Sequence, residues 1–476
     1  MRISVDTKNI FLWFFLSLFL FIYAHQDTSW CPSAVSRLDL LRAITIHGTV
    51  KIDAYHHNTG DKATYGGHFY SDKAPGTAAV ALPAFWLGLK AVNGLGIGNE
   101  NEFEWLFTSW VACSGSIAVI AAFGNVALFL WLKRRVPQRI ALLTSAGIFL
   151  GATVLPYNTM LFSHSMVVGC IAIAIWALDS RKPDEPAIEM NSGESFLSRQ
   201  KMRDIIAGFC LGLALASEYT SGIIVIGIAL GMLWRQVGRM IWVFIGAIPA
   251  LLLIPLYSWL CLGNPFTLPY SYNESYPDMK EGLYAIKYPD PETAVNLLFS
   301  PARGLLFWTP FFALSAIGYY IIFKESWRNI FIYYILPLVQ LIVISGRVWD
   351  WQAGPTMGPR YLAPMLPLLA LPCAIGLMKY KNAGLVLLII SIALSTLGTL
   401  TNACPNYRDH PNPLIDLHIP LLIKGEFAPN LGMLVGLSPY ASIYLYYFVL
   451  ICGLWWLWRR LPGDDKPPAK PEEVTG

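Results

Sequence analysis

Long apolar stretches recur along the chain and alternate with shorter polar segments. A helix of about 20 apolar residues crosses a hydrocarbon core about 30 Å thick and satisfies its backbone hydrogen bonds internally. The pattern predicts an all-α polytopic membrane protein with about 12 transmembrane helices. The fifth and sixth stretches are short and could form one broken helix. The spans are expected near residues 10–25, 105–132, 140–156, 166–179, 205–217, 221–234, 240–261, 305–323, 330–346, 361–378, 383–402 and 441–458.

The composition of the chain agrees with this architecture. Hydrophobic residues make up 55% of the chain and charged residues 13%, and the mean hydropathy is +0.49. A soluble globule has too little interior to hide that much apolar surface. The composition therefore excludes a soluble globular protein, and no nucleic-acid-binding motif is present.

The distribution of basic residues predicts the orientation of the spans. Segments on the side of the N-terminus hold most of the 34 Lys and Arg residues, and positive charge is retained on the cytoplasmic side. We therefore expect both termini on the cytoplasmic side. The membrane is expected to be a bacterial inner (plasma) membrane. The long segments on the opposite, periplasmic or luminal face are 26–104, 262–304, 347–360 and 403–440.

A single transmembrane domain is expected over residues 1–462, followed by a disordered cytoplasmic tail over 463–476. The tail is polar and contains several prolines, a composition typical of solvated linkers. The first apolar stretch ends without a small-residue cleavage site, so it is interpreted as a retained helix. Residues 77–95 are apolar but interrupted by a proline and a lysine, which favours an interfacial helix within the outer loop 26–104.

Polar chemistry concentrates in this first outer loop. Residues 37–76 hold a dense run of Asp, His, Lys and Arg in a chain otherwise suited to lipid. Titratable groups beside a bilayer are costly to desolvate, so those that occur there tend to bind or transform something. The loop is therefore the predicted centre of function.

Several strings resemble the GT-C membrane glycosyltransferases, in the branch that includes the aminoarabinose transferases acting on lipid A and the protein O-mannosyltransferases. The string LDLLRAITIHGTVKID after Ser36-Arg37 is similar to the helix that follows the first span in that branch. The string YSDKAPG at 70–76 looks like the segment that opens its interfacial helix. Further similar strings are LFSPARGLLFWTP (298–310), WDWQAGPTMGPRYLAPMLP (349–367) and NPLIDLHIPLLIKGEFAPNLG (412–432).

This resemblance implies a GT-C-like fold and an inverting glycosyltransferase. Such an enzyme would move a sugar from a polyprenyl-phosphate-linked donor to a lipid, glycan or protein acceptor on the periplasmic face. The alternative is a transporter or flippase of a polyprenyl-linked or glycolipid substrate, which predicts charges near the membrane midplane and repeated halves. A structural subunit is a third interpretation. The gathering of charge in one outer loop favours the enzyme.

The catalytic carboxylate has no direct match in the resemblance. The family's acidic residue usually precedes the loop arginine, here Arg37, by a few positions, but this chain has CPSAV at 31–35. Asp39 and Asp72 are the predicted catalytic residues. Each also has a structural interpretation, since Asp39 could pair with Arg42 and Asp72 could form a salt bridge or a helix cap. The other candidate carboxylates are Asp53, Asp61 and Asp350.

Four basic residues are predicted to bind the donor phosphate: Lys73, Arg360, Arg303 and Arg37. Lys73 comes first because it precedes the expected interfacial helix, whose N-terminus would add its dipole. Arg360 and Arg303 can offer bidentate contacts to a phosphate. The alternative is that each arginine anchors a helix end to lipid headgroups.

Further residues are predicted to line a substrate groove. Aromatic faces stack on sugar rings, and polar groups near the outer ends of spans are costly unless paired. The predicted groove residues are His68, Tyr70, Trp349, Asp350, Trp351, His164 and Glu218.

A divalent metal is left open, and no other cofactor is expected. The residues that could bind one are His56, His57 and His68 with Asp53, Asp61 and Asp72. Their spacing is not diagnostic of a metal, so no metal ligand is assigned.

Of the eight cysteines, all but Cys31 and Cys404 fall within predicted spans, where cysteine most often serves as a small packing residue. Cys31 and Cys404 fall on the outer, oxidising face. A disulfide between them is therefore conceivable, but the sequence does not give their separation.

The orientation predicts that single cysteines placed in 262–304 and in 403–440 react with a membrane-impermeant maleimide from the same side as a cysteine near residue 60. A cysteine beside the basic cluster after the 105–132 span serves as the control and should react only after the membrane is opened. Labelling of either long loop from the cytoplasmic side would contradict the assignment.

Overall fold

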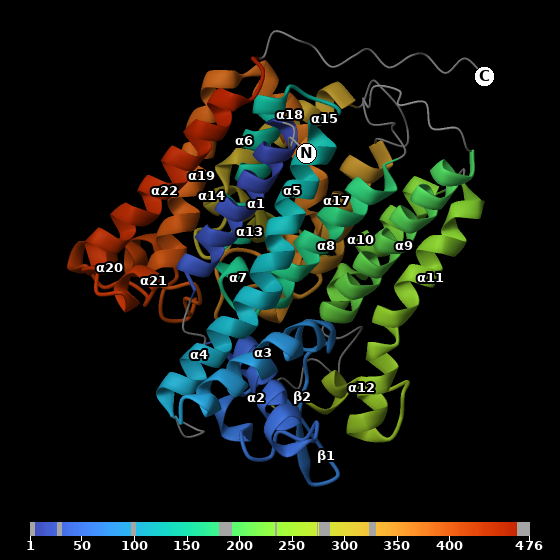
Figure 1. Cartoon of the computed structure of the whole chain (residues 1–476), viewed down its shortest axis with the longest axis vertical. Coiled ribbons are helices and arrows are strands. Elements are labelled where there is room, and N and C mark those ends of the chain that lie inside the picture. The colour runs from blue at the N-terminus through green and yellow to red at the C-terminus, as the bar shows by residue number, and fades with distance from the viewer. Residues whose placement is uncertain are drawn as a thin grey trace.

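The computed structural model is a bundle of helices that carries a small two-stranded sheet at one end (Figure 1). The residues that it describes are 5–25, 31–96, 101–179, 193–233, 236–273, 275, 286–322 and 330–463.

Six helical segments among the described residues are long and apolar enough to cross a membrane. The chain is therefore an integral membrane protein, whereas the total of about 12 spans stays a prediction. The six are α1 (Val5–Tyr23), α4 and α5 (Glu102–Cys113 and Val119–Leu132, joined by a π-helical turn), α11 and α12 (Val237–Leu251 and Leu253–Leu262), the 3-10 turn Arg360–Met365 with α18 (Leu366–Lys379), α19 (Lys381–Thr401) and α22 (Pro439–Arg460).

Further helices fill the space among these six. The expected break after the fifth apolar stretch is present, since α9 ends at Ser217 and α10 begins at Gly222. The helices in the bundle are α6 (Gln138–Phe149), α8 (Ser163–Leu178), α9 (Gly193–Ser217), α10 (Gly222–Leu233), α15 (Leu314–Ile322) and α17 (Leu336–Ser345). The short helices of the connecting segments are α7 (Leu155–Asn158), α13 (Pro291–Phe299), α14 (Leu305–Trp308), α20 (Ile419–Lys424) and α21 (Leu431–Leu434).

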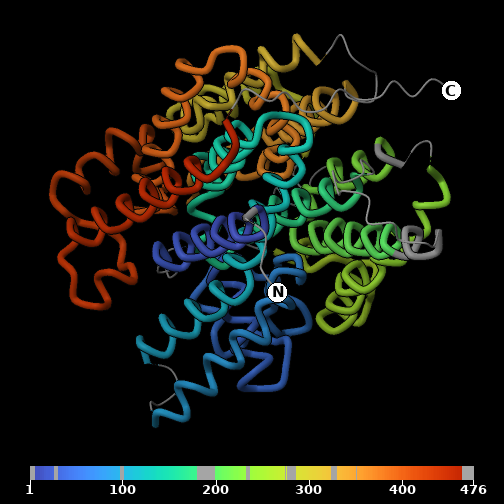
Figure 2. The backbone as a smooth tube through the Cα atoms, turned by 45° about the horizontal axis from the view of Figure 1, so that its top comes forward, coloured from blue at the N-terminus to red at the C-terminus, as the bar shows by residue number. Residues whose placement is uncertain are grey.

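Helices α5, α6 and α8 lie in the middle of the bundle, with α9 to α12 on one side and α19 to α22 on the other (Figures 1 and 2). Small residues let neighbours approach closely, as is common between membrane helices. A Cβ added to Gly208 of α9 would lie 1.9 Å from the carbonyl oxygen of Val243 in α11, and one added to Gly246 would lie 2.1 Å from that of Ile205. These glycines therefore fix the α9–α11 contact.

The two ends of the bundle differ in character. Helix α1 begins and α22 ends at the same end, and the sheet lies at the opposite end (Figure 1). Near the end where α22 finishes, Arg134 and Arg135 pair with Asp179, and Arg239 pairs with Asp204. This arrangement agrees with the basic side of the predicted topology, but the side of the membrane on which each end lies stays a prediction.

The end opposite the basic pairs carries the loop between α1 and α4, which is predicted to be the first outer loop. It consists of α2 (Pro32–His47), strands β1 (Lys62–Tyr65) and β2 (His68–Ser71), and α3 (Gly76–Gly94), which is the helix expected near 77–95. The antiparallel hairpin was not part of the all-α prediction. Gly66 and Gly67 form its two-residue turn with φ of 59° and 78°, a conformation that glycine adopts without strain.

Candidate functional site

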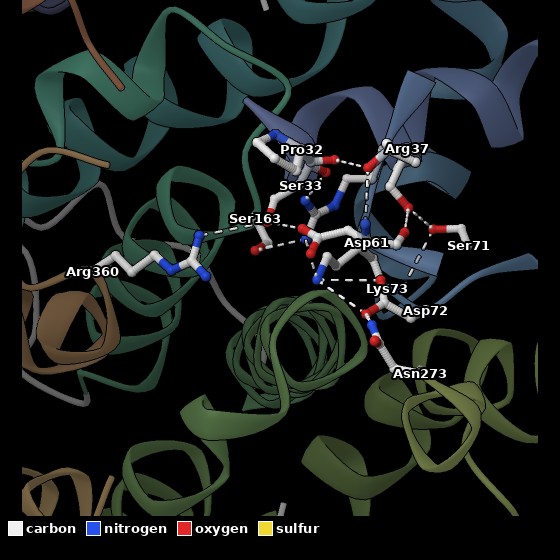
Figure 3. Close-up of polar contacts among 12 residues, drawn as sticks. Pro32, Ser33, Arg37, Asp61, Ser71, Asp72, Lys73, Ser163, Asn273 and Arg360 are labelled. Carbon is white, nitrogen blue, oxygen red and sulfur yellow. Dashed lines mark hydrogen bonds and ion pairs between the residues drawn. The ribbon is translucent and has the colours of Figure 1, made fainter. Parts of the chain in front are cut away.

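Several of the predicted site residues, among them Lys73, Asp72, Arg37 and Arg360, converge where α2, the hairpin, the start of α8 and the segment before α18 meet (Figure 3). At the centre, Lys73 Nζ lies 3.0 Å from a carboxylate oxygen of Asp61 and 3.2 Å from one of Asp72. All three side chains are buried, and the Tyr270 ring lies beneath Lys73 Nζ at 5.3 Å. Buried charges of this kind persist only when they are paired.

The hairpin brings these charges together. Asp61 immediately precedes β1, and Asp72 and Lys73 immediately follow β2, whose register pairs Lys62 with Ser71. Residues far apart in the loop thus become neighbours. Asn273, from a different outer segment, donates a hydrogen bond of 2.7 Å to Asp72 and closes the cluster from the other side.

Helix α2 supplies the hydroxyl groups that hold the hairpin. Ser33 Oγ donates to Asp61 Oδ2 at 2.7 Å, and Ser36 Oγ donates to the Asp61 carbonyl oxygen at 2.6 Å. Ser36 Oγ is also 2.7 Å from Ser71 Oγ. The string CPSAV lacks an acidic residue. Its Ser33 instead binds the carboxylate of Asp61, which directly precedes the hairpin.

The ionisation of the cluster follows from burial and from its charges. Burial opposes the charge on Lys73, but Asp61 and Asp72 outweigh it and raise the Lys73 pKa well above its usual range. Burial also opposes the charge on Asp61, yet Lys73 and the Ser33 hydrogen bond lower the Asp61 pKa. Burial raises the Asp72 pKa, and the neighbouring Asp61 adds to the effect. Asp61 is therefore the more readily ionised carboxylate.

Arg37 extends the polar cluster toward the bundle. Its guanidinium donates to the Ser33 carbonyl oxygen at 2.6 Å and to Ser163 Oγ at 3.0 Å. Ser163 in turn donates to Glu218 at 3.1 Å, and His164 Nε2 lies 3.7 Å from the same carboxylate. The predicted residues Arg37, His164 and Glu218 therefore belong to one connected network.

Arg360 reaches the cluster from the opposite wall (Figure 3). Its guanidinium lies 3.5 Å from Ser33 Oγ and 3.3 Å from the Tyr361 hydroxyl, and it lies over the Phe162 ring at 5.5 Å. A third cation thus faces the same space as Lys73 and Arg37.

Two adjoining cavities occupy this space and share Ser33, Lys73, Tyr270, Arg360 and Tyr361. The first is also lined by Asp61 and by the segment 353–355, and the second by Arg37, Ser163, His164 and Glu218. The first encloses about 30 Å³. The segment 353–355 forms one wall of this cavity.

The segment that forms this wall has an unusual backbone. Ala353 has φ of 62°, a left-handed conformation that a residue with a Cβ rarely adopts, and Gly354 follows with 67°. Arg303 holds the segment by donating to the carbonyl oxygens of Gln352 and Gly354, and it also donates to that of Pro405. Arg303 lines neither cavity, so its role is to hold the segment around Gly354 in place.

The two predicted catalytic residues differ in position. Neither lines the two cavities: Asp72 pairs with Lys73 at 3.2 Å, whereas Asp39 lies on another face of α2. Asn58 donates to Asp39 Oδ1 at 3.0 Å, and Oδ2 has no hydrogen-bond partner among the described residues. The expected pairing partner Arg42 instead binds Glu104 at 2.8 Å.

The remaining groove predictions fall outside the two cavities. His68 binds Asp53 at 2.7 Å on the exposed side of the hairpin, and Tyr70 is buried in β2. Trp349 and Trp351 are half-buried in the segment before the wall. The side chain of Asp350 is outside the described part of the structure.

Among the described residues, no group of three or more His, Cys, Asp and Glu side chains is arranged to hold a metal ion. His56 stacks on Phe69 at 4.0 Å, and His68 pairs with Asp53 at 2.7 Å. The site can therefore offer cations to an anion and carboxylates to a proton.

Sequence reasoning missed several residues of the site. Ser33, Tyr270 and Tyr361 line both cavities but carry no local signal of function. Asp61 was one alternative among several, because only the hairpin register places it beside Lys73.

No family model and no curated protein matches the chain. Among solved structures, it is similar to a crystal structure of the Archaeoglobus fulgidus oligosaccharyltransferase complex with Zn and sulfate, with a TM-score of 0.42 and 13% identity. The similarity covers 84% of this chain and 54% of that protein, so this chain spans about half of its length.

The position of Asp39 predicts a pH-dependent stability. Burial raises its pKa from the ordinary 3.8 to about 7, against the opposing effect of Asn58. Between these pH values the folded state holds a proton that the unfolded state releases, so stability falls as pH rises, by up to about 1.4 kcal/mol per pH unit. Asp39→Asn removes this contribution and keeps an acceptor for Asn58.

Unfolding measured between pH 4 and pH 8 should therefore show a smaller loss of stability with pH in Asp39→Asn than in the wild type. The control is Asp53→Asn, which replaces the exposed carboxylate that pairs with His68. Identical pH slopes for Asp39→Asn and the wild type would contradict the assignment.

Proposed function

We propose that this protein is a GT-C-like glycosyltransferase that transfers a sugar from a polyprenyl-phosphate-linked donor to a lipid, glycan or protein acceptor at the outer face of the membrane. The observation that carries the proposal is the set of three cations, Lys73, Arg37 and Arg360, that line adjoining cavities together with Asp61 and Glu218. Cations and carboxylates in one partly enclosed space suit the departure of a phosphate and the removal of a proton.

The cations suit a phosphate attached to a membrane lipid. Arg360 presents a planar guanidinium on one wall, and Lys73 presents a point charge on the other. Both lie beside apolar helices, so a polyprenyl chain could remain in lipid while its phosphate reaches the cluster. Charge-assisted hydrogen bonds from both walls would stabilise the phosphate as its bond to the sugar breaks.

The carboxylate suited to the role of base is Asp61 rather than the sequence-predicted Asp39. Asp61 lines the cavity and its pKa is lowered, so it is ionised at neutral pH. In a single displacement, an acceptor hydroxyl or amine attacks the anomeric carbon, the bond to the phosphate oxygen breaks, and Asp61 takes the acceptor proton. Attack opposite the departing phosphate gives inversion. Asp72 would then act on Lys73 by orienting its ammonium group.

Arg360→Gln should weaken the binding of polyprenyl phosphate by roughly 10- to 100-fold, because a charge-assisted contact is worth roughly 1.5 to 3 kcal/mol. Lys73 is less suitable for this test, because its removal leaves two buried carboxylates unpaired and threatens the fold. Binding is measured on the purified full chain with polyprenyl phosphate and with the corresponding polyprenol.

Lys62→Gln is the matched control. Lys62 is a cation of strand β1, donates to the His56 carbonyl oxygen and does not line the cavities. The variant should bind like the wild type. Equal affinity of the wild type for polyprenol and polyprenyl phosphate, or equal affinity of Arg360→Gln and the wild type for the phosphate, would contradict the proposed phosphate site.

Asp61→Asn should lower turnover by roughly 100- to 10,000-fold while polyprenyl phosphate still binds, because Asn keeps an acceptor for Ser33 but takes up no proton. Turnover is followed as the release of polyprenyl phosphate from lipid-linked sugars in native membranes. Asp53→Asn on the outside of the hairpin is the control. Full turnover in Asp61→Asn together with a loss in Glu218→Gln would overturn the assignment of Asp61.

A further inference from the structure

A further cavity of about 330 Å³ lies beside α2, apart from the two cavities of the candidate site. Its volume is within the range of small-molecule sites, about 300 to 1,000 Å³. The lining comes from α2, from the segment between α2 and β1, and from the start of α4, which lie together at the end of the bundle that carries the sheet (Figure 1). Among the residues that line it are Arg42, Tyr55, His57, Asn58, Glu102 and Trp105.

Helix α2 separates this cavity from the candidate site. Arg37 lines the second cavity of the site, whereas Arg42 lines the cavity beside α4. Five residues turn an α-helix by roughly 140° and advance it by about 7.5 Å, so the two arginines lie on different faces of α2. The cavity shares no lining residue with the two cavities of the site. It is therefore a separate place for a ligand.

The inner wall of the cavity is built around the Arg42 guanidinium. Arg42 is 6% exposed, binds Glu104 at 2.8 Å, and lies 4.9 Å from the centre of the Tyr55 ring and 5.4 Å from that of Trp105. The Tyr55 hydroxyl is 2.9 Å from His47 Nε2. Among the described residues, Glu104 is the one hydrogen-bond acceptor of Arg42, so donors remain of the five that a guanidinium carries. The wall is thus held in place and can still donate to a ligand.

The rim of the cavity is polar and exposed. His57, Asn58 and Glu102 belong to it, and all three are exposed. The Asn58 amide nitrogen donates to Asp39 Oδ1 at 3.0 Å, which fixes the side chain and leaves its oxygen as an acceptor. The rim therefore offers both donors and acceptors around an aromatic interior.

The charges around the cavity favour an uncharged ligand. The charge of Arg42 is compensated by the buried carboxylate of Glu104. An anion would meet the carboxylate of Glu102 at the rim, and a cation would meet the guanidinium of Arg42. A sugar offers hydroxyl groups that donate and accept without charge, and the apolar face of its ring suits an aromatic side chain such as Trp105.

We propose that this cavity binds a neutral carbohydrate. Its hydroxyl groups would bind Arg42, Asn58 and Glu102, and its ring would pack against Trp105. The binding itself is independent of the proposed transfer reaction. The identity of this carbohydrate as the part of a glycan acceptor that lies away from the reacting hydroxyl rests on the proposed function.

Binding is tested with the purified full chain in lipid nanodiscs on an array of neutral oligosaccharides, acidic oligosaccharides and short peptides. The wild type should bind at least one neutral oligosaccharide, and its affinity for that compound is then measured by calorimetry. Binding of no neutral oligosaccharide would overturn the proposal. Preferential binding of acidic oligosaccharides or of peptides would do so too.

Trp105→Ala should weaken the binding of that oligosaccharide at least about 10-fold, because a large aromatic side chain in a binding site carries much of the binding energy. Trp110→Ala is the matched control. Trp110 is also half-buried on α4, but it donates to the Ile22 carbonyl oxygen and does not line the cavity. It should bind like the wild type. Equal affinity of folded Trp105→Ala and Trp110→Ala would contradict the site.

His57→Ala keeps the test decisive if Trp105→Ala does not fold, because the exposed His57 side chain can be removed without opening the interior. This variant should weaken binding by roughly 2- to 10-fold, the effect of one hydrogen bond. Full affinity of His57→Ala would then overturn the proposal.

Arg360→Gln shows which cavity holds the oligosaccharide, since Arg360 lines only the two cavities of the candidate site among the three compared here. It should bind the oligosaccharide like the wild type. A loss as large as that of Trp105→Ala would place the carbohydrate in the candidate site and overturn the proposal. Because binding is measured without turnover, failure of this proposal is distinguishable from failure of the proposed function.

Discussion

Lys73 is buried within the outer layer, which consists of α2, the hairpin and α3. Its ammonium group lies 3.0 Å from Asp61 and 3.2 Å from Asp72. Removing one member of such a cluster leaves an unpaired buried charge, which typically costs about 3 to 5 kcal/mol. The rest of the outer layer is arranged around this constraint. The hairpin supplies all three charges, α2 supplies the serines that bind Asp61, and Asn273 completes the coordination of Asp72.

The same constraint connects the fold to the proposed chemistry. A cluster that must stay paired holds Lys73 in one position, and Arg37 and Arg360 are held near it by Ser33. The cations are therefore arranged in advance for an anion, so little reorganisation is required when a phosphate arrives. The cost of burying the charges is offset by their mutual attraction, and their position beside a cavity makes them available to a ligand.

Hydropathy alone was sufficient to predict a helical membrane protein and a helix near 77–95, because both depend on local composition. The polar string at 70–76 also led directly to Lys73. The sequence alone could not single out the proposed catalytic carboxylate, since the same charged loop holds Asp39, Asp53, Asp61 and Asp72. Only the turn at Gly66-Gly67 and the pairing of β1 with β2 bring Asp61 to Lys73 and leave Asp39 facing Asn58.

Long-range contacts explain the other differences. Arg303 and Arg360 both follow glycine- or proline-containing strings, yet one binds backbone carbonyl oxygens and the other faces the cavity. Such outcomes are set by tertiary structure and have no local pattern.

The proposed function requires the buried cluster around Lys73 to bind a lipid-linked phosphate. A density map of the full chain with bound polyprenyl phosphate tests it most directly. The phosphate is expected within hydrogen-bond distance of Lys73 and Arg360, with the Asp61 carboxylate on the sugar side. A phosphate bound elsewhere, with the cluster around Lys73 closed as it is here, would contradict the account.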